Sequence, residues 1–317
     1  MHCELVVPGL FGSRAASRFA ALELLLARGR SRASPAQRLE DWLRDAFDLG
    51  EAPFPAGALT LLACGHDPGA ESWMRADPVH LRLLRDHLAV VPANAFELSV
   101  EEAEALCDAL CQHFAGKAVF RTCGPKRWCA TWPASTTIDA GNPLDAAGRE
   151  VELPRETAAL LNEAQMVLHA HPVNEAREAR GEPAVNSIWL WGPGRAKRAN
   201  CAWQSVAADD PAVIGAARLA GARSRALPRS ARDWLDRLPE DGRHLAVLDS
   251  LRETPGELVL DRLEKEWFAP LLAALRSGRI GMVTVHVPDA ADALSFETIR
   301  ADLRRFWRRA KPLERYA

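Results

Sequence analysis

The chain has 317 residues, of which 48% are hydrophobic and 26% are charged. This composition is typical of a globular protein and excludes a disordered or collagen-like chain. The formal net charge is −2, so no global basic field attracts nucleic acid or an anionic lipid surface. No apolar run reaches the ~18 residues of a membrane span, and the first residues lack a signal-peptide pattern, so we expect neither.

The seven cysteines are scattered along the chain, and none forms a C-x-x-C pair. This spacing argues against a closed zinc site. An odd number of cysteines is typical of buried or incidental thiols in a reducing compartment. We therefore expect a cytoplasmic protein.

The first seventy residues show the pattern of a parallel sheet. Leu5–Val7 predict a short buried strand that ends at Pro8. Helices are expected over 15–28 and 36–48, and the apolar run at 59–64 predicts a second strand. Strands joined by crossover helices are the elements of a parallel sheet.

The middle of the chain has a different, α+β pattern. Ser99, followed by acidic residues, is a favourable helix start, and Pro154 suits the first position of a later helix. The expected elements are a strand at 88–91, a helix at 99–115, a hairpin of strands at 118–121 and 128–131, a connector rich in Pro, Gly and Asp at 133–150, and a helix at 154–169.

The α/β pattern returns in the last third. Strands are expected at 187–191, 202–206, 245–248 and 280–285, and helices at 210–220, 230–237, 257–276 and 297–310. We therefore predict an α/β core of helices around a sheet, built from 1–70 and 184–317, with a smaller α+β domain inserted at 71–183.

One segment combines polar side chains with glycines. It reads His171-Pro-Val-Asn174-x-x-Arg177, and after Asn186 a strand of sequence Ile-Trp-Leu-Trp ends in Gly-Pro-Gly. Glycines at a strand end allow a ligand or another backbone to approach closely, and arginine suits phosphate or carboxylate. The alternative is structural: the asparagines cap turns and the tryptophans are core. The predicted ligand-binding residues are His171, Asn174, Arg177, Asn186, Gly192, Gly194 and Asp67.

This segment resembles one found in the archaeal-type cofactor-independent phosphoglycerate mutases of the alkaline-phosphatase superfamily. Gly65-His66-Asp67-Pro68 resembles the family's L-G-Y-D-P, and Leu5–Leu10 resembles its opening strand. Ala76–Leu81 also recurs in a bacterial branch usually called RpfE-type regulatory proteins. The resemblance implies a phosphatase-like α/β core with an inserted domain, and a reaction at two divalent metals such as Mn²⁺ or Mg²⁺.

The sequence departs from the family where that chemistry would lie. Pro8 stands where the first strand should supply a metal-binding aspartate, and the nucleophile pair falls near Ala56-Gly57, with Thr60 as the nearest hydroxyl. Glu253 replaces the histidine that should follow Asp249 by four residues. The resemblance therefore implies no catalytic residue. The candidate ligands for a relocated ion are His244, Asp249, His286 and Asp289.

Three functions remain open at this point. The first is a regulatory or non-catalytic protein that binds a phosphorylated or anionic metabolite or a protein partner. The second is an active metal-dependent phosphomutase or phosphatase with relocated ligands. The third is a binding module in which the arginines of the expected helix at 297–310 contact nucleic acid or an acidic partner, although a solvated arginine face is commoner. Ser13 and Arg14 could also bind an anion at a helix start.

Overall fold

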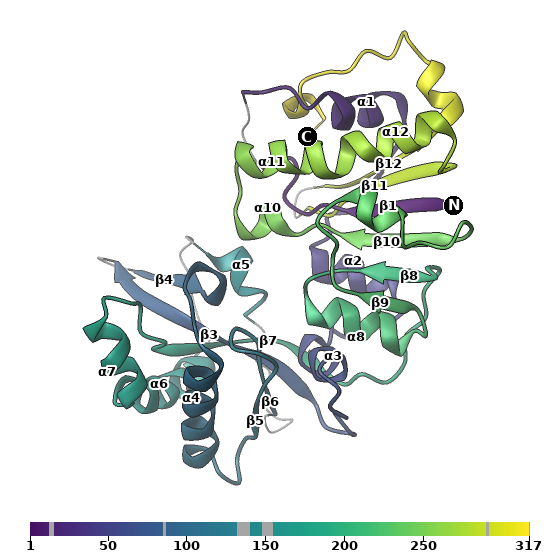
Figure 1. The fold of residues 1–317 in the computed structure, drawn as a ribbon. Helices are drawn as coiled ribbons and strands as arrows, with labels where there is room; N and C mark the ends of the chain where they lie inside the picture. Colours follow the sequence, from purple (N-terminus) through teal and green to yellow (C-terminus); the bar gives the residue numbers. More distant parts are fainter. Residues whose placement is uncertain (13–15, 85–86, 132–139, 148–154, 290–291, 317) are drawn as a thin grey trace. The chain divides into compact units, whose positions relative to one another are not determined.

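The computed structural model describes residues 1–12, 16–84, 87–131, 140–147, 155–289 and 292–316. The chain divides into two compact units (Figure 1). The larger unit contains Met1–Gly50 and Arg198–Ala317, and the smaller unit is Glu51–Lys197. Within the described residues, no helix combines the length and the apolar character that crossing a membrane requires.

The larger unit is built on a seven-stranded sheet. Its strands are β1 (His2–Val6), β2 (Arg30–Ser34), β8 (Ser205–Ala207), β9 (Arg223–Arg225), β10 (Arg243–Val247), β11 (Met282–Val287) and β12 (Ala293–Ile299). Their order in the sheet is β2-β12-β11-β1-β10-β8-β9. The five strands from β11 to β9 are parallel, β12 is antiparallel to β11, and β2 is antiparallel to β12.

Helices cover both faces of this sheet. They are α1 (Ala20–Arg28), α2 (Leu39–Ala46), α8 (Pro211–Leu219), α9 (Ala231–Leu235), α10 (Ser250–Glu253), α11 (Glu257–Leu263), the π-helical η2 (Glu264–Phe268), α12 (Ala269–Ser277) and the 3₁₀ turns η3 (Arg300–Arg304) and η4 (Leu313–Arg315). The helices α1, α11 and α12 lie on one side of the sheet and α2 and α8 on the other (Figure 1).

Alternation along the central strand decides which face holds the main core. Cys3 and Leu5 of β1 point to the face covered by α1 and α12 and pack with Leu22, Phe268 and Leu271. Because neighbouring residues of a strand point to opposite faces, Glu4 faces the other side. The large apolar cluster therefore lies on one face, and the opposite face carries a buried charge.

The smaller unit holds a second, antiparallel sheet. Its strands are β3 (Trp73–Leu84), β4 (His87–Pro92), β5 (Phe120–Thr122), β6 (Trp128–Thr131) and β7 (Ser187–Gly194). The long β3 pairs with β7 along one side, over 73–79. Along its other side β3 pairs first with β6, over 73–75, and then with β4, over 79–84.

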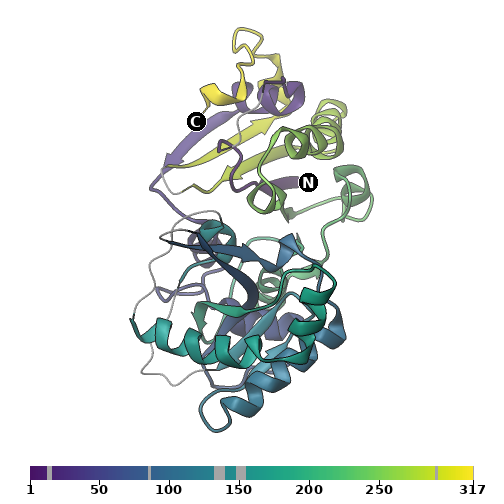
Figure 2. The same ribbon diagram turned by 90° about the vertical axis from the view of Figure 1, so that its left-hand side faces the viewer.

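The helices of the smaller unit are α3 (Ala56–Ala63), the 3₁₀ turn η1 (Ala93–Ala95), α4 (Val100–His113), α5 (Pro143–Ala146), α6 (Arg155–His169) and α7 (Pro172–Ala179). Ser99 and Glu102 form a reciprocal capping box at the start of α4, which satisfies two backbone donors. The helices α4 and α6 lie side by side (Figure 2). Leu106, Leu161 and Trp128 belong to the apolar core of this unit.

Most of the predicted elements are confirmed, with shifts of a few residues at their ends. This holds for the first strand, for the helices at α1, α2, α4, α6, α8 and α9, for the hairpin β5–β6, and for the strands β4, β7, β8, β10 and β11. The helix expected at 257–276 corresponds to α11, η2 and α12, which follow one another without a break. Pro154, much of the expected connector at 133–150, and Ser13 with Arg14 lie outside the described residues.

Two predicted elements are wrong. Residues 59–64 belong to α3 and its C-cap, because the apolar segment packs on all sides as a short buried helix. Residues 297–310 do not form one helix. The segment to Ile299 completes β12, which pairs with β11 and β2, and only a 3₁₀ turn follows at Arg300–Arg304.

The expected domain boundaries near residues 70 and 184 differ from the division of the chain in the structure. The chain changes unit near residues 50 and 198 instead. The helix α3 packs against β3 and β7, and β7 pairs with β3, so both belong to the smaller unit. Neither element supplies a strand to the seven-stranded sheet.

Candidate functional site

The segment 171–194 brings several of the predicted ligand-binding residues together in the smaller unit. Asn174 is buried and clamps the chain around it: its amide nitrogen donates to the carbonyls of Leu168 and Val185 at 2.7 and 2.8 Å. Its carbonyl oxygen accepts from the backbone N–H of Val185 at 2.8 Å. Asn174 therefore ties the start of α7 to the entry of β7 through two bonds and to the end of α6 through a third, all with backbone groups.

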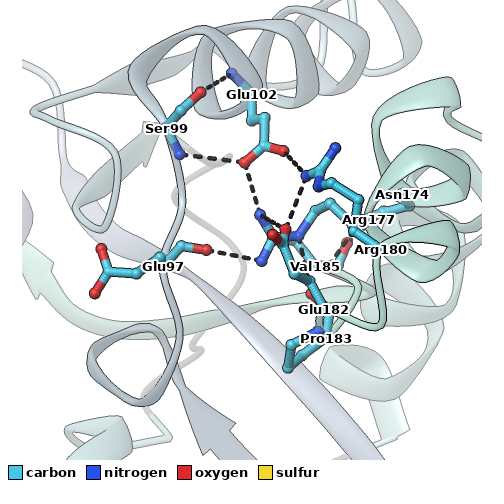
Figure 3. Close-up of polar contacts among 9 residues, drawn as sticks. All are labelled: Glu97, Ser99, Glu102, Asn174, Arg177, Arg180, Glu182, Pro183 and Val185. Carbon is cyan, nitrogen blue, oxygen red and sulfur yellow. Dashed lines mark hydrogen bonds and ion pairs between the residues drawn. The ribbon is translucent and has the colours of Figure 1, made fainter.

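Arg177 is 1% exposed and lies one helical turn beyond Asn174. Its guanidinium donates to the carbonyls of Pro183 and Glu97 at 2.9 and 2.7 Å, and to a carboxylate oxygen of Glu102 at 2.6 Å (Figure 3). The group also lies over the ring of Phe96, 5.7 Å from its centre. A planar fork with five donors suits this mixture of carbonyl and carboxylate partners.

Glu102 joins the arginine to the protein surface. Its second oxygen accepts from Arg180 at 2.6 Å, and Arg180 also contacts Glu182 at 2.8 Å (Figure 3). Burial raises the pKa of Glu102, but hydrogen bonds from the Ser99 backbone and from Arg180 and the charge of Arg177 lower it below its ordinary value. Glu102 is therefore ionised at neutral pH and holds both arginines.

The other predicted residues of the segment contact the backbone as well. His171 caps α7, because its Nδ1 accepts from the N–H of Val173 at 3.2 Å. Asn186 pairs with Leu81 of β3 in both directions, accepting at 2.7 Å and donating at 2.9 Å. Asp67 lies apart in an exposed turn, where it accepts from the N–H of Gly69 at 2.9 Å. Their ligand-binding role stays a prediction.

The two glycines that end β7 allow α3 to pack closely. A Cβ at Gly192 would lie 2.6 Å from the Cβ of Ala56, and one at Gly194 would lie 2.8 Å from the Cβ of Pro55. Gly192 also has a φ of +58°, which favours glycine. The close approach that the sequence predicts is therefore made by a helix start of this same unit.

The residues that occupy the place of the family's nucleophile pair also lie at the start of α3, where this helix packs against the sheet. Ala56 and Gly57 begin α3 and are buried. A Cβ at Gly57 would lie 2.4 to 2.5 Å from the backbone of Met74, so no side chain fits without a shift of α3. Neither residue carries a hydroxyl, and Thr60, the nearest hydroxyl in the sequence, is fully buried.

Thr60 belongs to a buried network that the sequence reading missed. Arg75, which is 1% exposed, donates to Oδ1 of Asp77 from two nitrogens, at 2.6 and 2.9 Å, and to Oγ1 of Thr60 at 3.3 Å. The indole N–H of Trp191 donates to the other oxygen of Asp77 at 2.9 Å. Arg75 and Asp77 stand two apart on β3, so alternation along a recognised strand would have placed them on one face.

The larger unit gathers acidic residues at the carboxyl ends of its parallel strands, where ligands of open α/β sheets commonly bind. Asp209 and Asp210 follow β8, and Asp249 follows β10. Asp210 caps α8, and Asp209 accepts from the N–H of Leu227 at 3.2 Å. Burial, with the negative charges of Asp210 and Glu253, raises the pKa of Asp249 to about 7.

The four candidate metal ligands do not share one place. His244 lies near the start of β10, roughly 15 Å from Asp249 at ~3.3 Å per residue of strand. Both of its nitrogens are engaged, with Ser205 Oγ at 2.8 Å and the carbonyl of Asp241 at 3.1 Å. Among the residues that the structure describes, no group of three or more His, Cys, Asp or Glu side chains is arranged to hold a metal ion. The described donors therefore do not fit the two-metal centre that the resemblance implies.

His286 belongs instead to a charged cluster under α2, on the face of the sheet opposite the main core. Its Nε2 lies 3.1 Å from an oxygen of the buried Glu4, and its ring packs on Trp42. Arg243 donates to the other oxygen of Glu4 at 2.8 Å. Burial would raise the pKa of Glu4, but the hydrogen bonds from His286 and Arg243 lower it to about 2. Asp289 follows β11, and its carbonyl accepts from the N–H of Gln37.

Comparison with solved structures shows the class of fold. The structure of PH0037 protein from Pyrococcus horikoshii matches 94% of this chain and 87% of its own chain, with a TM-score of 0.54 and 14% identity. The two chains therefore share an α/β fold. A cofactor-independent phosphoglycerate mutase from Thermoplasma acidophilum matches with a TM-score of 0.43 and 18% identity, which is too distant to carry an argument.

Comparison of the sequence with curated proteins finds two phosphoglycerate mutases. A probable 2,3-bisphosphoglycerate-independent phosphoglycerate mutase from Geobacter sulfurreducens is 40% identical over 63 residues, 18% of this chain and 16% of the relative. A 2,3-bisphosphoglycerate-independent phosphoglycerate mutase from Methanosarcina mazei is 27% identical over 216 residues, 58% of this chain and 50% of the relative. The chain thus spans half or less of these curated relatives. No family model matches it.

Proposed function

We propose that this chain is a phosphoglycerate-mutase-like protein of the alkaline-phosphatase superfamily that has lost its two-metal centre and acts by binding. Its ligand would be a phosphorylated or anionic metabolite, or a protein partner, and its role regulatory, as in the RpfE-type branch. The similarity to the two curated mutases supports the family relation. A cytoplasmic location agrees with seven cysteines that are all thiols.

One observation carries this proposal: the place of the nucleophile pair is filled by Ala56 and Gly57. Gly57 has no room for a side chain because α3 lies against the backbone of Met74. Phosphoryl transfer in the family needs a hydroxyl there and two ions beside it. Thr60 cannot substitute, since it is fully buried and its hydroxyl accepts from Arg75.

The test is a turnover assay of the purified full-length chain with Mn²⁺ or Mg²⁺. Isomerisation of phosphoglycerates and hydrolysis of a phosphate monoester are measured with and without a chelator. We expect no turnover above the uncatalysed rate. Metal-dependent turnover that is lost on chelation would overturn the proposal, and its loss in Thr60→Ala would identify the nucleophile.

An active enzyme with relocated ligands is a second candidate. Burial, and after it the negative charges of Asp210 and Glu253, raise the pKa of Asp249, and a cation would relieve the repulsion among these carboxylates. Calorimetric titration with Mn²⁺ tests it. Under this candidate the wild-type chain binds the ion and Asp249→Asn does not, whereas Asp261→Asn, a change on the exposed side of α11, binds as wild type. Absence of binding in the wild-type chain would remove this candidate.

A nucleic-acid-binding module is the third candidate, favoured by Phe306 and Trp307, which are 77% and 66% exposed. Arg304, Arg308 and Arg309 are exposed too, but Arg308 donates to the carbonyl of Gly29 at 2.8 Å. Arg304→Ala with Arg309→Ala is therefore the cleaner variant. Binding of single-stranded DNA that weakens steeply with salt, and is lost in this variant, would support the candidate.

A further inference from the structure

Three cysteines of the smaller unit meet along one face of α3. Gly57, Thr60 and Cys64 follow one another at spacings of three and four, so they lie on one side of the helix. The hairpin β5–β6 packs there: the thiol of Cys129 donates to the carbonyl of Gly57 at 3.5 Å, and that of Cys123 to the carbonyl of Thr60 at 3.9 Å. Cys64 occupies the next turn.

Cys123 lies beside Cys64. Its thiol and the backbone N–H of Cys64 share one acceptor, the carbonyl of Thr60, at 3.9 and 3.1 Å. Cys64 is exposed, Cys123 is half-buried and Cys129 is fully buried. The three sulfurs therefore lead from solvent into the contact between α3 and the hairpin, with Cys123 in the middle.

Their surroundings distinguish the exposed thiol from the two that are less accessible. Among the described ranges of the chain, no set of three such side chains is arranged to hold an ion. Hydrogen bonding with Cys129, and then burial, raise the pKa of Cys123, so this thiol stays protonated at neutral pH and is not the one that attacks the oxidant first. The exposed Cys64 is the thiol that a dissolved oxidant reaches first.

We propose that Cys64 and Cys123 form a reversible disulfide, with Cys64 as the attacking thiol, Cys123 as the resolving thiol, and a low-molecular-weight disulfide as the oxidant. The Cys64 thiolate attacks one sulfur of that disulfide, its S–S bond breaks, and one small thiolate leaves. Cys123 then loses its proton to solvent and attacks the sulfur of Cys64, and the second small thiolate leaves. Two protein thiols are oxidised by two electrons, and one small disulfide is reduced to two thiols.

The product would fix the C-terminal end of α3 to the turn that follows β5. This is the helix whose start packs under Gly192 and Gly194 at the end of β7. The proposed disulfide is independent of the proposed function, because neither cysteine belongs to the residues predicted to bind a ligand.

The experiment treats the full-length reduced chain with oxidised glutathione, blocks remaining thiols and digests with trypsin. Cleavage after Arg121 and Lys126 isolates the Cys123 peptide from that of Cys129, and Cys64 lies in a peptide that ends at Arg75. We expect a linked pair of peptides that joins Cys64 to Cys123 and separates on reduction.

Three variants test the roles assigned to Cys64 and Cys123. Cys64→Ser should abolish the link, Cys123→Ser should leave a stable glutathione adduct on Cys64, and Cys201→Ser, in the other unit, should change nothing. Alkylation rates give a second measurement in the wild-type chain, with Cys64 expected to react before Cys123 and Cys129. A link between Cys123 and Cys129, no link at all, or faster alkylation of Cys129 than of Cys64 would overturn the proposal.

Discussion

Replacing Arg177 with alanine tests whether the segment 171–194 holds the fold together. The side chain is 1% exposed and makes three short contacts, to the carbonyls of Pro183 and Glu97 and to the carboxylate of Glu102. Its loss leaves two carbonyl oxygens without this donor and weakens the hold on one carboxylate. Buried acceptors without donors destabilise a folded protein.

The magnitude follows from these contacts. A hydrogen bond from a charged group contributes ~1.5–3 kcal/mol, and breaking a buried ion pair costs ~3–5 kcal/mol. The ion-pair share is discounted here, because Glu102 is partly exposed and keeps its contact with Arg180 at 2.6 Å. We expect the free energy of unfolding to fall by about 3–5 kcal/mol, a decrease of ~6–20 °C in Tm for a chain of this kind.

Arg180→Ala is the matched control. Arg180 contacts the same carboxylate but is 48% exposed, so its loss should cost much less stability than the loss of Arg177. Urea denaturation followed by tryptophan fluorescence measures both variants, since Trp128 and Trp189 report burial in this unit. If Arg177→Ala loses no more stability than Arg180→Ala, the structural account of this segment is refuted. Unchanged stability with lost binding of an anionic metabolite would make Arg177 a ligand residue instead.

Further predictions concern packing and protonation. Gly57→Ala should destabilise the chain by about 1–3 kcal/mol in urea titrations, because its Cβ meets the Met74 backbone, whereas Gly281→Ala, with its nearest neighbour at 3.5 Å, should be close to neutral. Glu4 has a folded pKa of about 2, so its contribution of about 3 kcal/mol is present above pH 4.5 and is lost as the pH falls toward 2. Glu4→Gln should flatten acid denaturation curves in that window; an unchanged curve would contradict the assignment. The pH dependence of the stability that Asp249 causes has the opposite sign. Because its pKa is raised to about 7, the wild-type chain loses stability as the pH rises from 4 to 7. Asp249→Asn should therefore be more stable than wild type at pH 8, by on the order of 4 kcal/mol, with no difference below pH 4; thermal denaturation at both pH values checks this.

Elements with a local signal could be predicted from the sequence. The capping box of Ser99 and Glu102 fixes the start of α4, and Asp210 before Pro211 fixes the start of α8. The helix α3 could not be predicted, because an eight-residue apolar run has no period that separates a buried helix from a buried strand. What decides its form is the contact of Gly57 with the backbone of β3.

The long strand β3 could not be predicted because of its residue types. The segment 73–79 contains Arg75, Asp77 and Pro78, and this composition does not predict a strand. The structure resolves each of them: Arg75 and Asp77 neutralise one another, and Pro78 stands between the residues of β3 that pair with β6 and those that pair with β4. At Pro78 the strand pairs with β7 alone, so on its other side a missing N–H breaks no ladder bond.

The candidate site, too, could be predicted only in part. Residue types such as asparagine and arginine could be singled out along the sequence, but their partners could not. Asn186 bonds Leu81, which is 105 residues away, and Arg177 bonds Glu102, which is 75 residues away. Whether a polar side chain serves a ligand or the backbone depends on such pairs, and only the folded chain brings them together.

The segments that resemble the mutases and the absence of a hydroxyl at Ala56-Gly57 have one physical explanation. Asn174, Arg177 and Asn186 hold turns and strands of the smaller unit, so a sequence can keep them for folding alone. At Gly57 the opposite holds, because the close packing of α3 on β3 forbids any side chain there. A serine introduced at Gly57 would push α3 from its place before it could act as a nucleophile. Similarity carried by the backbone clamps therefore argues for the fold, and an activity would need a rearranged α3 as well as a hydroxyl.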